Sequence, residues 1–374
     1  MEIRKLGFGA MRLPLLQADD PKSIDLEQVK RMADLFMERG FVYVDTAYPY
    51  HGEQSEAAVR EAVVRRFPRE SFLLADKLPI LRVREAADYP RFFEEQLERC
   101  GVDYFDVYLL HNIGRDRYIN TTAYGGFEFI RRMKEEGKAR KIGFSYHDDA
   151  QTLDRILTEH PEVDVVQLQI NYLDWEGAVA QSRRCYETAV RHGKDVIVME
   201  PVKGGKLAEL QGPASELFTS FYQGRDPMPT PASLAVRFAA SHEHVRIVLS
   251  GMSSLAQMKD NTGYMEDFCA LSSAEYELTE RIADALRKSI RVQCTNCRYC
   301  TEVCPKNIAV PDYFGLLNLH AVTGQKTNMY YQRYSMNHGK ASECIQCGQC
   351  ERNCPQHLPI REYLKEFAAL YEND

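Results

Sequence analysis

The sequence contains no apolar run long enough to span a bilayer, and its N-terminus has no apolar stretch followed by a small-residue cleavage site. These absences predict a cytoplasmic protein with no membrane span. The chain also has no excess of positive charge, since 47 Lys and Arg stand against 54 Asp and Glu, a formal net charge of −7. Because no basic field would draw it onto nucleic acid, we expect no nucleic-acid partner, and small molecules or other proteins instead.

Cysteines are scarce over most of the chain and concentrated near its end. Of the eleven, Cys100, Cys185 and Cys269 stand alone, whereas the other eight form two tight runs. A chain of 374 residues can bury at least one large core, and the change in cysteine usage predicts two domains. We place a first domain at 1–268, a linking helix at 269–289 and a cysteine-rich domain at 290–374.

The first region alternates short apolar runs with amphipathic stretches. The runs are too short for helices and read as strands buried on both faces: "LGFGAM", "FVYVDTA", "SFLLADK", "YFDVYLLH", "RKIGFS", "VDVVQLQIN", "KDVIVMEP" and "VRIVLSG". Eight strand–helix units predict an α/β fold, a closed (β/α)8 barrel of the TIM type. An open doubly wound sheet is the alternative, but no GxGxxG follows the first run. Pro, Gly and aromatic residues in segment 210–231 predict a long loop or lid.

The two cysteine runs share one spacing, C-x2-C-x2-C-x3-C-P. Three thiolates at this spacing can hold one [4Fe–4S] cluster, while the fourth reaches the other cluster. We therefore expect two clusters with crossed ligand sets, Cys294, Cys297, Cys300 and Cys354 on one, and Cys344, Cys347, Cys350 and Cys304 on the other. A pair of zinc sites is the alternative. The region resembles the two-cluster ferredoxin family, and its long helix-like insert suggests a mainly α-helical variant.

In a (β/α)8 barrel, polar residues at the carboxyl ends of the strands are the catalytic candidates. Here they include Asp45 and Tyr50 after the second strand, Lys77 ending the third and His111 ending the fourth. A proton must be delivered to a carbonyl oxygen as hydride reaches its carbon, and Tyr50 could deliver it. A neighbouring ammonium, Lys77, would stabilise the phenolate, Asp45 would orient Lys77, and His111 would contact the substrate oxygen. The alternative is a set of unrelated packed or ion-paired side chains.

The stretches "LGFGAMRLP", "DTAYPYHGEQSE", "LLADKLP", "YFDVYLLH", "KIGFS" and "SGMSSLAQMKDN" resemble the aldo-keto reductase family across the first 268 residues. The resemblance implies a barrel that passes hydride between a nicotinamide and a carbonyl or alcohol substrate, with Asp45, Tyr50, Lys77 and His111 as its catalytic tetrad.

Cofactor-binding candidates follow from the resemblance and from two glycine-rich turns. "PVKGGK", with Lys203 and Gly204, follows the seventh strand, and "SGMSS" follows the eighth, where barrels commonly bind phosphate. The resemblance implies that Ser145 and Gln167 hold the nicotinamide carboxamide. It also implies that the residues near the adenine end are Gly251, Ser253, Gln257 and Asn261.

Three departures from the family pattern leave the cofactor open. Tyr146 stands where the family commonly has Asn, and Met199 replaces the usual stacking aromatic ring. The usual cations for a 2′-phosphate are replaced by Gly251 and Gln257, so NADH and NADPH remain alternatives, and the barrel mouth has room for a flavin.

Substrate contacts are less well marked. Tyr48, Trp175 and the stretch "NIGRDRYINTTAYGG" could line a pocket, with Arg115 or Arg117 available for an acidic substrate. The alternative is that Trp175 packs under a loop and the arginines are solvated.

The chain combines two redox chemistries. A hydride carries two electrons, whereas a [4Fe–4S] cluster exchanges one electron at a time. Coupling between them therefore needs a flavin or another mediator. Our prediction is an aldo-keto reductase-like oxidoreductase with two clusters for electron transfer and a redox protein as a further partner. Two alternatives remain: a barrel that works alone beside structural or oxygen-sensing clusters, and an electron-transfer or docking protein whose barrel is not a working reductase.

Overall fold

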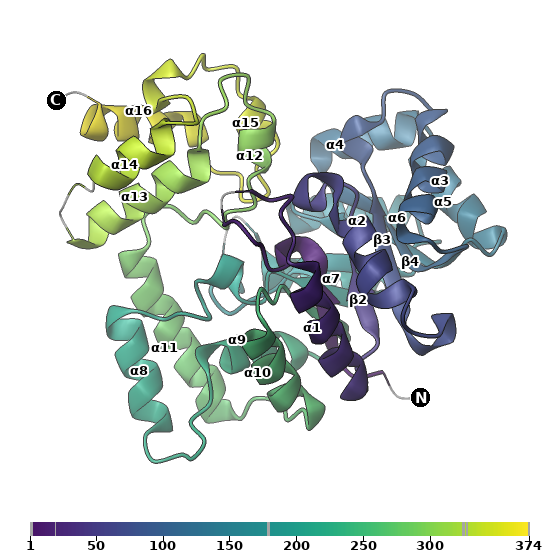
Figure 1. Ribbon diagram of the computed structural model, residues 1–374, viewed down its shortest axis with the longest axis horizontal. Helices are drawn as coiled ribbons and strands as arrows, with labels where there is room; N and C mark the ends of the chain where they lie inside the picture. The colour runs from purple at the N-terminus through teal and green to yellow at the C-terminus, as the bar shows by residue number, and fades with distance from the viewer. Residues whose placement is uncertain (1–2, 19, 178–179, 324–325, 327, 373–374) are drawn as a thin grey trace. The chain divides into compact units, whose positions relative to one another are not determined.

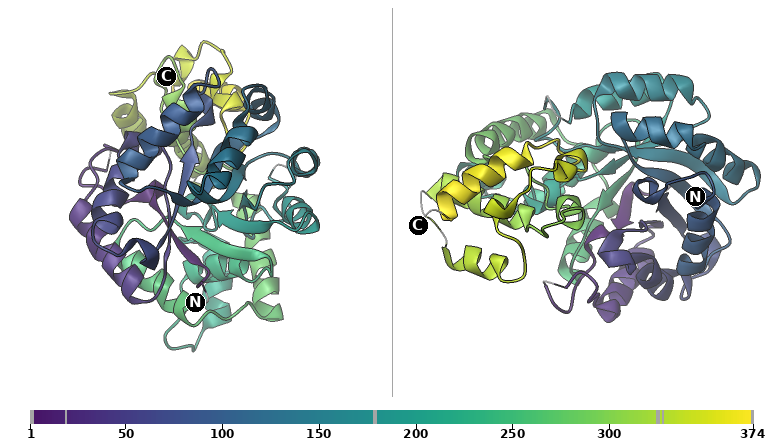
Figure 2. Two further views of the ribbon diagram at one scale, coloured as in Figure 1. Left: turned by 90° about the vertical axis from the view of Figure 1, so that its right-hand side faces the viewer. Right: turned by 90° about the horizontal axis from the view of Figure 1, so that it is seen from above.

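A computed structural model describes residues 3–18, 20–177, 180–323, 326 and 328–372. Eight parallel strands close into a barrel in sequence order, β1 to β8, which confirms the predicted fold (Figure 2). The strands are Leu6–Gly9, Tyr43–Asp45, Leu73–Leu78, Phe105–Ile113, Ala139–Tyr146, Val165–Gln169, Asp195–Met199 and Val245–Ser250.

The barrel interior is a packed core. Side chains from several strands form one buried apolar cluster, which includes Tyr43, Val107, Val165, Ile197 and Ile247. Gly143 on β5 lies so close to β6 that a Cβ there would be 1.9 Å from the backbone oxygen of Val165, so a side chain would not fit. Packing of both faces explains why the strands are continuous apolar runs.

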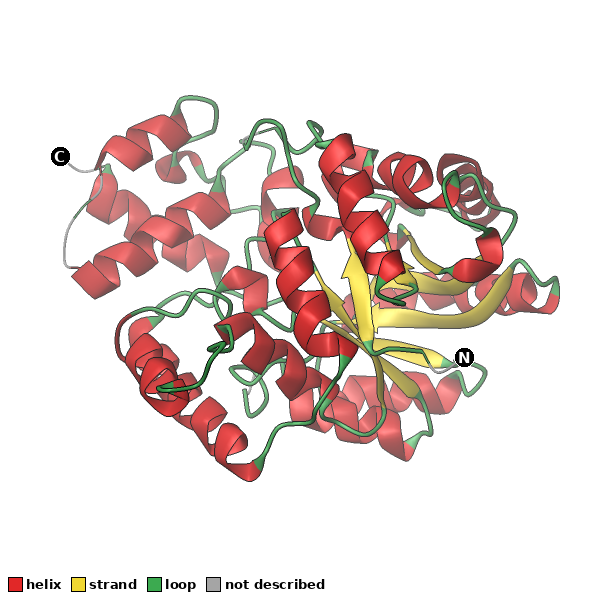
Figure 3. Ribbon diagram, turned by 60° about the horizontal axis from the view of Figure 1, so that its bottom comes forward, coloured by secondary structure: helices red, strands yellow, loops and turns green. Residues whose placement is uncertain are grey.

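Helices form the outer layer around the strands (Figure 3). Those of the barrel region are α1 Leu26–Glu38, α2 Ser55–Val59, α3 Asp88–Cys100, α4 Arg115–Ala123, α5 Gly126–Glu135, α6 Ala150–Glu159, α7 Ser182–Arg191, α9 Pro231–Ala240 and α10 Leu255–Glu266 (Figure 1). Side-chain caps begin several of them, such as Asp25 on α1, Asp149 on α6 and Ser254 on α10. Among the described residues, no helix combines the length and apolar character needed to cross a membrane.

Contacts divide the chain into two compact units. The barrel unit holds residues 1–202, 207–209 and 224–276, and the cysteine unit holds 203–206, 210–223 and 277–374. Helix α11, Ser273–Ser289, spans the sequence boundary between them. The cysteine unit is therefore discontinuous in sequence.

Segment 210–231 is not simply a loop or lid, because it contains helix α8, Gly212–Tyr222. Pro213 stands in the first turn of α8, where the missing N–H of proline costs no hydrogen bond. The buried side chains of α8 are Ala214, Phe218 and Tyr222. The proline that suggested a loop begins a helix.

The C-terminal part of the cysteine unit is helical. Its elements are α12 Tyr299–Glu302, α13 Val310–Thr323, α14 Asn328–Ser335, α15 Gln349–Arg352 and α16 Ile360–Tyr371. Tyr313 of α13 stacks on Phe367 of α16 with ring centroids 4.6 Å apart, in a core to which both cysteine runs contribute.

The cysteine unit contains an internal repeat with an offset of 50 residues. Cys294 corresponds to Cys344, α12 to α15, and α13 to α16. Three backbone positions with positive φ also repeat, namely Asn296 and Gln346, Arg298 and Gly348, and Asn307 and His357. The two halves thus share backbone conformation as well as cysteine spacing.

Candidate active site and cysteine centres

The four predicted catalytic residues include three that lie in direct contact. Lys77 on β3 is fully buried, and its Nζ donates to Asp45 Oδ1 at 2.5 Å, to the Thr46 carbonyl at 2.8 Å and to the Tyr50 hydroxyl at 3.4 Å. The His111 ring lies edge-on to the Tyr50 ring with centroids 5.8 Å apart. Strands β2, β3 and β4, with the turn after β2, therefore bring Asp45, Tyr50, Lys77 and His111 together.

Burial and neighbouring charges set the protonation of this group. Burial raises the pKa of Tyr50 well above its usual value, and the nearby carboxylates of Asp45 and Glu200 add to the rise. Burial lowers the pKa of His111 well below its ordinary value, and the positive charge of Lys77 adds to the fall. Near neutral pH, Tyr50 is therefore a protonated phenol and His111 a neutral imidazole.

Asp45 belongs to the same buried cluster. Burial raises the pKa of its carboxyl group, whereas the charge and hydrogen bond of Lys77 oppose the rise. The pair places an ammonium beside the hydroxyl of Tyr50, where it would favour a phenolate over a phenol. The arrangement can thus donate a proton from Tyr50 and stabilise the phenolate that remains.

Two further predicted residues, Ser145 and Gln167, lie on adjacent strands as direct register partners of β5 and β6. Both are buried, and Gln167 Oε1 has no hydrogen-bond partner within the described part of the chain. Asn112 joins them, since its backbone N–H donates to Ser145 Oγ at 2.7 Å. Its own Oδ1 is a second buried acceptor without a partner among the described residues.

The acceptor oxygens of Asn112 and Gln167 fit a ligand group that donates hydrogen bonds, such as the amide of a nicotinamide. Tyr146, which stands where the family commonly has Asn, is unsuited to that role because its hydroxyl donates to the carbonyl of Asp149 at 2.6 Å. Sequence reasoning missed Asn112, for which the departure at Tyr146 was the available signal.

The turn after β8, where the sequence predicts phosphate binding, leads into the N-terminus of α10. Ser253 and Gln257 are exposed, and the Gln257 side chain accepts from the backbone N–H of Ser253 at 2.7 Å. Asn261 is buried and accepts from Ser250 Oγ at 3.2 Å, so it joins the end of β8 to α10. The structure thus gives Asn261 an internal partner and leaves Ser253 and Gln257 on the surface.

Arg12, after β1, is a cation near this turn that sequence reasoning missed. A Cβ on Gly251 would lie 3.4 Å from the Arg12 side chain, and Ser253 Oγ donates to the Arg12 carbonyl at 2.8 Å. Its guanidinium lies 3.9 Å from a carboxylate oxygen of Glu200, the residue after β7. Met199, which ends β7, is half-buried.

The predicted substrate contacts separate into two groups. Trp175 stacks on His242 with ring centroids 4.2 Å apart, and Tyr48 donates to Glu95 at 3.2 Å, so both have internal packing or bonding partners. Arg115 is exposed and pairs with Asp149. Arg117 donates to the carbonyl of Asn112 at 3.0 Å, and its charge helps to lower the pKa of His111. Of these residues, Arg117 is the one associated with the tetrad.

Lys203 and Gly204 group with the cysteine unit. Lys203 is 1% exposed, and its Nζ donates to Gln356 Oε1 at 2.7 Å. Gly204 has φ of 65°, and a Cβ there would lie 2.5 Å from the Thr295 carbonyl. Both partners, Thr295 and Gln356, adjoin the cysteine runs.

The eight clustered cysteines surround two cavities in the crossed sets that the sequence predicts. The first cavity has about 300 Å³ of space, part of it open to solvent, and is lined by Cys294, Cys297, Cys300 and Cys354. Thr295 and Gln356 line it as well. Each run thus contributes three cysteines to one cavity and its last cysteine to the other.

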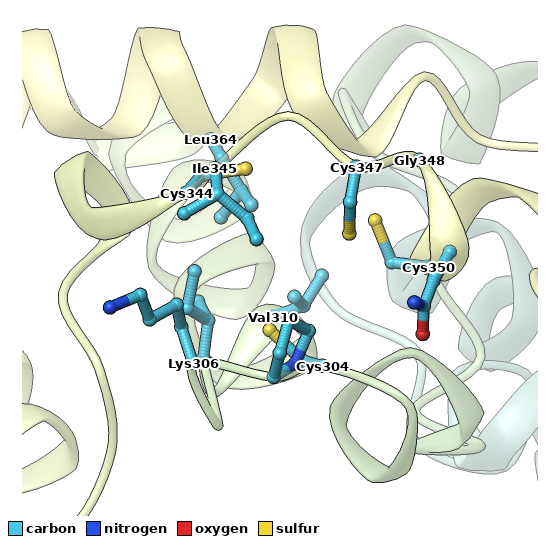
Figure 4. Close-up of a pocket in the computed structure, with 12 residues that line it drawn as sticks. Cys304, Lys306, Val310, Cys344, Ile345, Cys347, Gly348, Cys350 and Leu364 are labelled. Carbon is cyan, nitrogen blue, oxygen red and sulfur yellow. The ribbon is translucent and has the colours of Figure 1, made fainter.

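The second cavity has about 350 Å³ of space, again partly open, and is lined by Cys304, Cys344, Cys347 and Cys350. Figure 4 shows Cys304 facing the other three cysteines across the cavity, with Lys306 beside it. Hydrogen-bond donors lie close to cysteine sulfur atoms at both cavities. The backbone N–H of Asn296 donates to Cys294 Sγ at 3.4 Å, and the side-chain amide of Gln346 donates to Cys344 Sγ at 3.5 Å.

Four thiols around a cavity with nearby N–H donors fit a [4Fe–4S] cluster, because thiolates are its ligands and such donors tune its potential. Among the described residues, no three or more His, Cys, Asp or Glu side chains converge on a point where they could hold a single metal ion.

Comparisons with known proteins agree with this architecture. Residues 5–284 match the aldo/keto reductase family, and residues 293–358 match the 4Fe-4S dicluster domain. The chain is similar to an L-galactose dehydrogenase of Arabidopsis thaliana, with 25% identity over 75% of this chain and 90% of that protein. It is also similar to an NADH-specific methylglyoxal reductase of Escherichia coli, with 23% identity over 67% of this chain and 85% of that protein.

Solved structures share the barrel fold. An aldo/keto reductase from Klebsiella pneumoniae, in complex with NADP and acetate, has a TM-score of 0.60 at 20% identity and covers 75% of this chain and 92% of its own. The solved structure thus supports the barrel fold, and the 4Fe-4S family match supports the cysteine-rich domain.

Proposed function

This chain belongs to the aldo/keto reductase family and carries a 4Fe-4S dicluster domain, and from that premise we propose that it interconverts a small carbonyl and an alcohol by nicotinamide-dependent hydride transfer. The observation that carries the proposal is the buried Lys77 ammonium, which contacts both Asp45 and the Tyr50 hydroxyl.

The residues of the tetrad divide the work of proton delivery. A bound nicotinamide would supply the hydride. Tyr50 donates its proton to the substrate oxygen, and Lys77 stabilises the resulting phenolate. His111 donates a hydrogen bond to the same oxygen through its one N–H group. Its lowered pKa keeps the ring uncharged. Asp45 orients Lys77 and compensates its buried charge.

The cofactor would be held by the polar ends of β4 to β6. Asn112, Ser145 and Gln167 would bind the carboxamide, while Gly251, Ser253 and Gln257 would lie toward the adenine end with Arg12 nearby. The relatives include an NADH-specific reductase and a complex with NADP, so both nicotinamides stay within the proposal. Electron exchange between nicotinamide and clusters would require a flavin or another mediator.

The two cysteine sets would each hold one [4Fe–4S] cluster, and such clusters supply one-electron transfer. Crossed ligation would tie the two halves of the C-terminal unit together, because each cluster would draw on both runs. A cytoplasmic location and a redox protein partner fit this proposal, since free thiol ligands persist in a reducing compartment.

The substrate would be a small carbonyl compound, and one that carries an acid group is favoured. The positive charges of Lys77 and Arg117 both act on His111. A carboxylate on the substrate would be attracted to this group of charges. Acidic carbonyl compounds should therefore have lower KM values than neutral ones of similar size.

The Tyr50→Phe variant tests the reaction. It removes the proton donor while leaving the ring in place, so we expect kcat for carbonyl reduction to fall by about 10²–10⁴-fold. Nicotinamide affinity, measured by fluorescence, should not change. Unaltered kcat would contradict the role of Tyr50 as proton donor, whereas absence of carbonyl reduction by the wild type would favour an electron-transfer protein without a working reductase.

Anaerobic titration with NADH and then NADPH tests whether the two redox parts communicate. The broad visible absorbance of oxidised clusters should bleach with the preferred nucleotide, and analysis of the same sample should reveal the mediator. Carbonyl turnover without bleaching would indicate that the barrel works alone. Stoichiometric zinc in an iron-replete anaerobic preparation would contradict the cluster assignment.

A further inference from the structure

We propose that the second cysteine site, formed by Cys304, Cys344, Cys347 and Cys350, has a docking face for an acidic one-electron carrier protein. This inference rests on the proposed iron–sulfur function and assigns the two sites different roles. The docking face consists of Ile345, Cys347, Gln349 and Lys306, all exposed and all lining the second cavity.

The internal repeat allows the two sites to be compared position by position. Thr295 of the first half corresponds to Ile345 of the second, and Gln356 corresponds to Lys306. Both members of each pair line their own cavity. Equivalent surfaces therefore exist at both sites, and the residues that cover each surface can be compared directly.

At the first site this surface is covered by residues 203–206, which group with the cysteine unit. Lys203 donates to Gln356 at 2.7 Å, Gly204 lies against Thr295, and Lys206 donates to the Val292 carbonyl at 3.4 Å. Thr295 is consequently only 3% exposed. The first site has its own internal cover.

At the second site the equivalent surface is open. Ile345 is 57% exposed, and Lys306 and Cys347 are also exposed. A large aliphatic side chain stands in the solvent at the position that a buried threonine occupies in the other half. An apolar centre beside a prospective redox site suits a transient protein contact, which commonly buries less than about 1,200 Å².

The charges around this face favour an acidic partner. Besides Lys306, Arg352 donates to the Cys347 carbonyl at 3.3 Å and Arg361 donates to the Gln346 carbonyl at 3.4 Å. The carboxylate of Glu351 is paired with Arg361 at 2.7 Å, and that of Glu343 accepts the backbone N–H of Lys340 at 3.1 Å. Three cations thus stand against two carboxylates around the docking face, an excess of one positive charge, although the whole chain carries a net charge of −7.

The exchange at this face is a single-electron step. The reduced carrier would lose one electron and a cluster held by Cys304, Cys344, Cys347 and Cys350 would accept it, with no bond made or broken. Complementary charge raises the rate of such encounters and makes it depend on ionic strength. The step needs no nicotinamide or carbonyl substrate, so it can be measured apart from the proposed reductase activity.

The test uses the full-length, cluster-loaded protein and a plant-type [2Fe–2S] ferredoxin of acidic composition. Binding is measured by calorimetry at low and at high salt, and stopped-flow absorbance follows cluster reduction by the pre-reduced ferredoxin. We expect Ile345→Glu and Lys306→Glu each to weaken binding and to slow reduction about tenfold or more. The control matched to Ile345→Glu is Met336→Glu, which adds the same charge at a side chain 78% exposed that lines neither cavity, and should behave like wild type.

Two further measurements check that the variants keep their clusters. Iron content and the rate of reduction by methyl viologen radical should be equal in all variants. Failure of the wild type to bind the ferredoxin at low salt would overturn the proposal, as would equal effects of the Met336 and Ile345 substitutions. A wild-type dimer that Ile345→Glu converts to a monomer would overturn it in favour of a second copy of the chain. Tyr50→Phe, which disables the proposed reductase, should bind the ferredoxin normally, so the two proposals can fail independently.

Discussion

Asn112 is a residue that the strand pattern could not reveal. Successive side chains of a regular strand face opposite sides, so a residue directly after His111 would be expected to point away from it. The backbone of Asn112 instead has φ of 64°, which breaks the alternation near the end of β4. Its amide oxygen remains a buried acceptor without a partner in the described residues, a costly arrangement that a ligand donor would relieve.

The amide of Asn112 should therefore contribute to nicotinamide affinity. We expect Asn112→Ala to raise the dissociation constant about 3–10-fold, as the loss of one hydrogen bond would do. Tyr146→Phe is the matched control, because it removes only the bond to Asp149 and should leave the affinity unchanged. Fluorescence titration measures both. A larger rise in the dissociation constant for Tyr146→Phe than for Asn112→Ala would mean that position 146, where the family commonly has Asn, binds the nicotinamide.

The pH dependence of carbonyl reduction follows from two residues of the tetrad. The pKa of His111 lies well below its ordinary value and that of Tyr50 well above its own, so neither group changes charge between about pH 6.5 and 9. The profile of kcat/KM should be flat over this interval. Protonation of His111 below its lowered pKa would add a positive charge beside Lys77, and activity should fall there. A midpoint near pH 6.5 that disappears in His111→Gln would contradict the neutral-ring assignment.

Asp45, Tyr50, Lys77 and His111 could be found from the sequence because barrel geometry gathers polar residues at strand ends, whatever their distance along the chain. The structure brings all four together. Arg12 was missed although it also follows a strand, β1. Its neighbours Gly251 and Glu200 are remote in sequence, and no local pattern marks such a contact.

At the scale of elements, all eight strands were predictable because burial on both faces makes each one a short apolar run. Helix α8 was not, because Gly212 and Pro213 at its start read as loop residues. Its grouping with residues 277–374 is also a long-range property. Sequence periodicity reports which face of an element is buried but not which distant element covers it.

The segment 203–206 makes a testable electrostatic contribution to the first cysteine site. Lys203 is buried and bonds to Gln356, which lines that cavity. Because reduction adds negative charge to a cluster, a nearby ammonium should raise its potential. We expect Lys203→Gln to lower the midpoint potential of one cluster by on the order of tens of millivolts.

Redox titration monitored by electron paramagnetic resonance would show this shift. Lys365→Gln removes an exposed charge of α16 in the same unit and should leave both potentials unchanged. Equal shifts of both clusters in Lys203→Gln would indicate a general structural change. No shift in either would show that the ammonium does not act on the first site.

At the scale of the whole molecule, the discontinuous cysteine unit predicts how the chain responds to truncation. A fragment that ends at residue 272 keeps all eight barrel strands but lacks residues 277–374, with which 203–206 and α8 form one unit. Phe218 and Tyr222, buried in the full chain, should then be exposed. We expect the fragment to have a lower melting temperature and to aggregate, which circular dichroism and light scattering would show. A monomeric fragment with an unchanged melting temperature would contradict this expectation.

The short connection after β7 also bears on how such a chain could arise. If the cysteine-rich region were an independent attachment, it could be moved between barrels by joining gene segments end to end. Residues 203–206 lie between two barrel strands in sequence and yet contact the neighbours of Cys294 and Cys354. A barrel that acquired the cassette would need a matching connection between its seventh and eighth strands, so a transplant of the cassette to another barrel would have to include residues 203–206.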